Sequence, residues 1–166
     1  MFLPHMSGAA SPVVDGQSLG VFAGLTPRAT RGDLLRSIIE GLDYQFLDMV
    51  LALENSLQSS LERLIAVGGA TRNEFWMQNK ADVAGRTLEI PDVEEATPLG
   101  AAILAGIGVG LYENEEDAYQ HVRRPGKMYH PDPQRAKQYA RWFEIYQQMY
   151  PATKTLNHRL FKEFTT

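Results

Sequence analysis

The sequence contains no cysteine among its 166 residues. Disulfide bonds, thiolate nucleophiles and cysteine metal sites are therefore excluded, and a reducing, cytoplasmic location is expected. The four histidines are scattered, without a second histidine or carboxylate at a zinc-ligand spacing, so we predict no metal site. Basic residues are also few, with a net charge of −4 and no basic cluster beyond Arg123-Arg124. A nucleic acid is therefore not an expected partner.

Apolar runs are too short for a membrane-spanning helix. The longest uncharged stretch, Ala96 to Tyr112, is shorter than the ~20 residues that a spanning helix needs, and it contains four glycines. We predict a fully buried helix here and no membrane as partner. The opening, Met1 to His5, lacks the basic and apolar regions of a signal peptide and is typical of a cut inside a larger protein.

The residues that are present predict one α/β domain. Hydrophobic residues make up 44% and charged residues 22%, as in ordinary globular proteins. We divide the chain into a loop at 1–19, an α/β core at 20–125 and C-terminal helices at 126–166. Apolar periodicity predicts strands at 21–25, 64–67 and 88–90, and helices at 31–56, 76–85, 99–111, 132–150 and beyond Pro151. Thr30 and Thr97 are the expected N-caps of the first and third helices, and Pro151 is expected to end the fourth.

One turn could carry chemistry. Gly68-Gly69 follows a predicted strand and precedes a helix, where a ligand could approach the backbone. By itself the pair also fits a plain tight turn that needs positive φ. Neither the dinucleotide-binding G-x-G-x-x-G nor the G-x-x-x-x-G-K-[ST] phosphate loop is present. Of the carboxylates near apolar residues, Glu40, Asp43 and Asp82, none is paired with a nucleophile, and we interpret Glu40 as a hydrogen-bonded structural group.

Three ordered blocks resemble the FGGY family of carbohydrate kinases. The first comprises Gly20–Leu25, Asp33-Leu34 and Ser37–Glu40, and is similar to the second signature of the family. The second, Gly68–Asn73 continuing to Gly85, resembles the family's adenosine-binding turn and following helix. The third, Thr97–Ala102 with Ala105-Gly106, resembles its downstream buried helix. Together the blocks cover most of residues 2–150.

The resemblance implies an α/β, actin-like ATPase fold of the ribonuclease H-like type, with this chain as part of the C-terminal domain of a two-domain sugar kinase. Its cofactors would be ATP and Mg²⁺. Carried over to this sequence, Gly69 and Ala70 would lie against the adenine or ribose, Asn73 would hydrogen-bond the base region, and Gly68 would complete the turn. The family's catalytic aspartate, phosphate-binding motif and sugar contacts precede the region resembled. We therefore expect no catalytic residue in this chain and no turnover by it alone.

The expected partners are ATP or ADP, and a sugar bound through the missing N-terminal domain. The opening Phe2–Gly8 is similar to xylulokinase-type members and favours a ketopentose such as xylulose, with glycerol, fuculose, erythritol or another polyol as alternatives. A non-catalytic nucleotide-binding or interaction module is a second hypothesis, and an unrelated α/β domain with a parallel doubly wound sheet is a third. Loss of the other half should expose apolar surface around Phe2, Leu3 and Phe22, which predicts homo-oligomers.

Overall fold

The computed structural model describes residues 1–93, 95–124 and 126–165. Its strands and helices follow one another in the order β1 Phe2–Leu3, β2 Val21–Phe22, α1 Arg31–Leu57, β3 Arg63–Ile65, a 3₁₀ turn η1 Gly69–Arg72, α2 Glu74–Ala84, β4 Thr87–Ile90, α3 Ala96–Gly108, α4 Glu115–Val122, β5 Lys127–Tyr129 and α5 Pro133–Thr165. β1 and β2 form an antiparallel ribbon, and β3, β4 and β5 form a separate sheet in that order. The domain is therefore α/β, as predicted.

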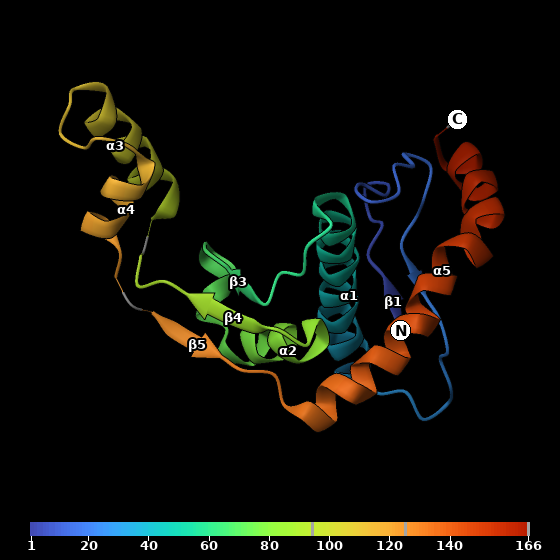
Figure 1. Ribbon diagram of the computed structural model, residues 1–166. Coiled ribbons are helices and arrows are strands. Elements are labelled where there is room, and N and C mark those ends of the chain that lie inside the picture. Colours follow the sequence, from blue (N-terminus) through green and yellow to red (C-terminus); the bar gives the residue numbers. More distant parts are fainter. Residues whose placement is uncertain (94, 125, 166) are drawn as a thin grey trace.

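The longest predicted helix, α1, has the expected start. The Thr30 hydroxyl accepts a hydrogen bond from the Asp33 amide, and the Asp33 carboxylate accepts one from the Thr30 amide. This reciprocal capping box satisfies donors that the first helical turn leaves free. α1 then packs against β1, α2 and α5 (Figure 1). A core of aromatic and aliphatic side chains joins these elements: Leu3, Tyr44, Leu47, Val83, Tyr139, Phe143, Tyr146 and Met149.

A second, smaller core lies between α2 and the three-stranded sheet. Met77 and Ala81 from α2 pack on Leu88 of β4 and Tyr129 of β5. β3 runs parallel to β4, and β5 runs antiparallel to it. The sheet is therefore mixed, which disagrees with the all-parallel sheet that the third hypothesis required.

The pair α3 and α4 projects away from the sheet (Figure 1), and α3 packs mainly against α4. The prediction of a fully buried helix at 99–111 is wrong, because Gly106 is the buried residue of α3. The predicted start of this helix, with Thr97 as its N-cap, is wrong as well. α3 begins at Ala96 after Glu95, which makes no side-chain cap, and Thr97 lies inside the first turn. Pro98 fits there because the first four amides of a helix have no partner within the helix.

The prediction that Pro151 ends a helix is wrong as well. α5 continues through it from Pro133 to Thr165, and Figure 1 shows the helix bending in its second half. Contacts hold both sides of the proline in place. Tyr146 and Met149 lie in the core before it, and the buried Asn157 after it donates to the Leu19 carbonyl at 3.0 Å.

Short strands appear where the sequence predicts loop or helix. β1 lies within the segment 1–19, and β5 lies within 126–166. Strands of two and three residues are too short for apolar alternation to identify, and here they form by pairing with β2 and β4. The loop 9–18 is held by Asp15, whose carboxylate accepts hydrogen bonds from His158 at 2.7 Å and Tyr150 at 2.8 Å. These bonds, that of His158 first, lower the pKa of Asp15 to about 2.

The chain exposes apolar surface, as expected, but only one of the three residues predicted to be exposed is so. Phe2 and Leu3 are buried, at 7% and 1% exposure, because β1 lies against α1, whereas Phe22 is 42% exposed. Larger exposures occur at Leu104 (64%), Val109 (82%) and Leu111 (69%) in and after α3. Within the described part of the chain, no helix combines the length and apolar character needed to cross a membrane.

We expect copies of this chain to associate through the apolar face of α3. Leu104→Glu should shift the sedimentation coefficient at high protein concentration toward that of the monomer, because it places a charge on the exposed face. Leu25→Glu is the matched control, since Leu25 is 60% exposed in a loop far from α3 in sequence. A wild-type chain that sediments as a monomer at every concentration would contradict this prediction.

Candidate functional site: the glycine turn after β3

The turn that follows β3 is built on a backbone conformation that favours glycine. Gly68 has φ +102° and ψ 176°, a region in which side chains other than glycine are strained. The Thr71 amide and hydroxyl both donate to the Gly68 carbonyl, at 3.1 and 2.7 Å. The Asn73 amide donates to the Ala70 carbonyl at 3.1 Å, which closes the 3₁₀ turn. The turn is therefore rigidly shaped by its own hydrogen bonds.

The glycines leave space that no protein atom fills. A Cβ added to Gly68 or Gly69 would meet nothing within 4 Å. Packing within the chain thus does not require glycine at position 69. At position 68, the positive φ favours glycine. Open space above a side-chain-free backbone is what a flat ligand needs in order to lie against the turn.

Asn73 has a structural role in addition to the one implied by the resemblance. Its side-chain oxygen accepts a hydrogen bond from the Trp76 amide at 3.1 Å and so caps α2. An N-cap of this kind is worth roughly 1 kcal/mol. This cap was not predicted from the sequence, although asparagine immediately before an apolar-periodic helix is its usual signal. The side-chain nitrogen of Asn73, Nδ2, remains the group that could donate to a ligand.

An open hollow of about 540 Å³ lies beside the turn. Gly68 and Gly69 line it, together with Val67, Thr71 and Arg72, whereas Ala70 and Asn73 are not among its lining residues. The structure thus brings two of the four predicted site residues to the hollow and leaves the other two at its margin, on the same turn.

The opposite wall follows β4 and was not predicted. It comprises Pro91, Asp92, Val93, Glu95, Ala96 and Thr97. A signal was available, because ligands in α/β proteins bind at the carboxyl ends of parallel strands, and β3 and β4 are parallel neighbours. Both the glycine turn and this segment leave such an end.

The charges around the hollow are mixed. Arg72 is the cation among its described lining residues, and Asp92 and Glu95 are the carboxylates. A net negative wall repels a phosphate chain and suits an uncharged group. The charges of the described lining residues therefore suit an uncharged group of a ligand better than an anionic one.

A buried polar network holds α2, and with it the turn, against α1. Asp43 is fully buried and accepts hydrogen bonds from Trp76 Nε1 at 2.9 Å and Asn79 Nδ2 at 2.7 Å. The Lys80 ammonium lies 2.7 Å from the same carboxylate and 4.3 Å from the centre of the Phe46 ring. Burial raises the pKa of Asp43, and Lys80 opposes that rise.

The other two carboxylates considered for catalysis are also engaged in structure. Glu40 accepts from Arg36 at 2.8 Å and from the Tyr139 hydroxyl at 3.0 Å, the hydrogen-bonded environment expected for it. Asp82 accepts from Gln78 at 2.9 Å and from the Asp132 amide at 2.8 Å. Across the described ranges, no three metal-ligating side chains cluster in a way that could hold an ion.

Comparison with known proteins places these features in a family. The model of the C-terminal domain of the FGGY family of carbohydrate kinases matches residues 1–109. The xylulose kinase of Staphylococcus epidermidis is 27% identical over 156 residues, covering 94% of this chain and 31% of the relative. The glycerol kinase of Trichormus variabilis is 39% identical over 113 residues, covering 68% of this chain and 23% of the relative.

A solved structure agrees with these relatives. The glycerol kinase of Plasmodium falciparum, determined with ADP, matches with a TM-score of 0.73 and 27% identity, over 89% of this chain and 30% of that one. The chain belongs to the FGGY family of carbohydrate kinases and has the actin-like ATPase fold of that family's C-terminal domain. It spans about a third or less of the length of these relatives.

Proposed function

We propose that this chain is the adenosine-binding part of an ATP-dependent kinase that phosphorylates a hydroxyl group of a ketopentose or polyol. The observation that carries the proposal is the open space above Gly68 and Gly69, beside a hollow whose charges disfavour phosphate. In this proposal the base or ribose lies on Gly69 and Ala70, and the side-chain nitrogen of Asn73 donates a hydrogen bond to the base region. The solved relative that contains ADP supports a nucleotide as ligand.

The sugar would be bound by a part of the complete kinase outside this chain, and the catalytic aspartate would lie in that same part. Xylulose is our proposed substrate and glycerol the nearest alternative, since relatives of both kinds match. Magnesium would accompany ATP in the complete enzyme. A cytoplasmic location is likewise proposed.

Titration of ADP into the chain tests the site, and Gly69→Val is the sharpest variant. A Cβ added at position 69 would meet no protein atom within 4 Å, so valine should be accommodated by the fold while its side chain fills the ligand's space. We expect affinity for ADP, measured by calorimetry or NMR, to fall by about tenfold or more. Gly16→Val is the matched control, because an added Cβ there also meets nothing, and its affinity should equal that of the wild type.

A serine at position 73 separates the two roles of Asn73. Asn73→Ser keeps an oxygen that can cap α2 but removes the amide donor, so it should weaken ADP binding without lowering the melting temperature. Binding unchanged by Gly69→Val would refute the site. Saturable ADP binding combined with no phosphorylation of any sugar by the complete protein would instead favour the non-catalytic module.

A further inference from the structure

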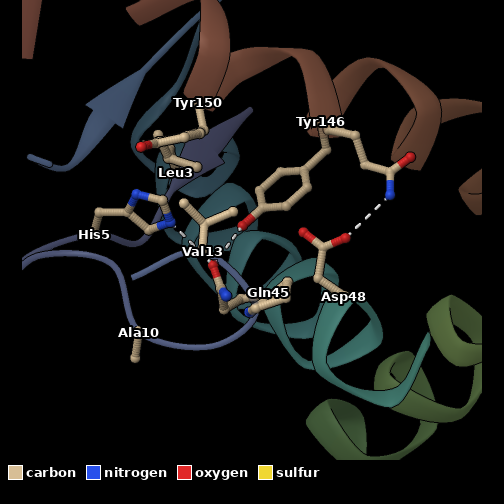
Figure 2. A pocket seen from close by; sticks show the side chains of 10 residues that line it. Leu3, His5, Ala10, Val13, Gln45, Asp48, Tyr146 and Tyr150 are labelled. Carbon is tan, nitrogen blue, oxygen red and sulfur yellow. Dashed lines mark hydrogen bonds between the residues drawn. The ribbon is translucent and has the colours of Figure 1, made fainter. Parts of the chain in front are cut away.

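A second pocket, unconnected with the glycine turn, opens between the N-terminal segment, α1 and α5 (Figure 2). Its volume is about 270 Å³, and it shares no lining residue with the hollow beside the turn. We call it the Asp48 pocket. Its polar and aromatic lining consists of His5, Gln45, Asp48, Tyr146, Gln147 and Tyr150, and the rest is aliphatic.

Most polar groups in the Asp48 pocket already have partners within the chain. His5 Nδ1 lies 2.7 Å from the Ser18 hydroxyl, and His5 Nε2 lies 3.1 Å from Gln45 Oε1. The Tyr146 hydroxyl donates to the same oxygen at 3.2 Å, and the Gln45 amide donates to the Ser11 carbonyl at 3.1 Å. These bonds fix the walls of the pocket.

Asp48 is paired through only one of its two carboxylate oxygens among the hydrogen bonds of the pocket lining. One carboxylate oxygen accepts a hydrogen bond from Gln147 Nε2 at 3.1 Å. Figure 2 shows the other oxygen on the side that faces the Tyr146 ring. Among the residues described as lining the pocket there is no lysine or arginine to balance this charge. Burial raises the pKa of Asp48, which reflects the cost of an ionised group in this position.

The neighbouring charged and titratable groups do not supply the missing cation. Burial lowers the pKa of His5, so its imidazole is neutral near pH 7. His158 pairs with Asp15, at 2.7 Å, outside the pocket lining. The Lys154 ammonium lies 5.5 Å from the centre of the Tyr150 ring and is also not a lining residue. The pocket therefore presents one negative charge inside a neutral wall.

We infer that the Asp48 pocket binds a small organic cation, an alkylammonium group, whose nitrogen donates to the Asp48 carboxylate and whose alkyl chain lies against Tyr146 and Tyr150. Aromatic faces attract cations and also cover aliphatic carbon. A metal ion fits less well, because Ca²⁺ and Mg²⁺ require several oxygen ligands and the described residues form no cluster of metal-ligating side chains. The ammonium could belong to a free amine or to a lysine of another protein, and both share this chemistry.

The test is a titration of the ¹⁵N-labelled chain with n-butylamine at pH 7.5, at constant ionic strength, followed by NMR. We expect saturable shifts of the side-chain amides of Gln45 and Gln147. Asp48→Asn should weaken binding by about tenfold or more, whereas Glu144→Gln, which removes an exposed charge from α5, should bind as the wild type does. Butan-1-ol, which has the same carbon chain without the charge, should not saturate the site.

Two further measurements sharpen the result. Lowering the pH through the raised pKa of Asp48 should abolish binding, because the carboxyl loses its charge and His5 gains one. This check uses the wild-type chain and does not depend on the folding of a variant. A blocked lysine, Nα-acetyl-lysine methylamide, identifies the source of the cation. Binding of both probes indicates a lysine of a partner protein, and binding of butylamine alone indicates a free amine.

Three outcomes would overturn the inference. They are the absence of a saturable shift with n-butylamine, an equal affinity in Asp48→Asn, and equal binding of butan-1-ol. None of them bears on ADP binding, since the two pockets share no residue.

Discussion

Replacing Lys80 by methionine should lower the free energy of unfolding by about 3–5 kcal/mol. Methionine keeps the apolar contacts of the lysine stem but removes the ammonium that lies 2.7 Å from Asp43. The carboxylate is fully buried, and without its cation it must either remain as an uncompensated charge or take up a proton. Denaturant unfolding at pH 7 measures the effect.

Lys127→Met is the matched control for this change. Lys127 pairs with Glu74 at 2.6 Å, but both side chains are exposed, at 54% and 71%. Solvent screens an exposed pair of this kind, which therefore contributes little to stability, so the control should unfold almost as the wild type does. Equal losses for Lys80→Met and Lys127→Met would show that Asp43 does not depend on its cation.

The sign of the pH dependence follows from the raised pKa of Asp43. A carboxyl whose pKa is higher in the folded state than in the unfolded state binds its proton more tightly when folded. Its charge therefore costs stability at neutral pH, and that cost disappears as the pH falls through the folded-state pKa. Lys80→Met should raise the pKa of Asp43 further. The difference in unfolding free energy between the variant and the wild type should therefore be largest near pH 7 and should shrink on acidification.

Replacing Gly41 by alanine should destabilise the chain by about 1–3 kcal/mol. Gly41 is a buried residue of α1, and a Cβ added there would overlap the carbonyl oxygen of Phe2. The obstacle is backbone, so β1 must move away from the helix. This cost exceeds the gain of up to about 1 kcal/mol that alanine brings to a helix interior.

Gly32→Ala provides the control on the same helix. Gly32 is exposed, and the nearest atom to an added Cβ is the Thr30 hydroxyl at 3.6 Å. Only the helix gain should therefore appear, as unchanged or slightly raised stability. Thermal unfolding of both variants measures the contrast, and a Gly41→Ala protein as stable as Gly32→Ala would mean that β1 does not pack on α1 as described.

Local signals predicted the parts of the fold that depend on neighbouring residues. The start of α1 at Thr30 is correct because the capping box is complete within four residues. The glycine turn is in its expected place because Gly68 determines its own backbone conformation. The proposed roles of Gly69, Ala70 and Asn73 rest on the resemblance and stay a prediction until ADP binding is measured.

Errors arose where distant contacts overrule local preference. Pro151 should end a helix, yet buried residues on both sides of it, Met149 and Asn157, keep α5 continuous. The uncharged α3 should be buried, yet it packs mainly against α4 and remains largely exposed. Composition indicates that a helix needs apolar cover but carries no information on whether that cover lies within the same chain.

By itself the sequence determined the family, the α/β class, the capped start of α1 and the location of the glycine turn, because short contiguous motifs specify each of them. The tertiary structure alone decided that the segment after β4 faces that turn, that Lys80 neutralises Asp43, and that no lysine or arginine is among the described residues lining the pocket of Asp48. These pairings join residues far apart in the chain. Their energies depend on burial and distance, which exist only once the helices have packed.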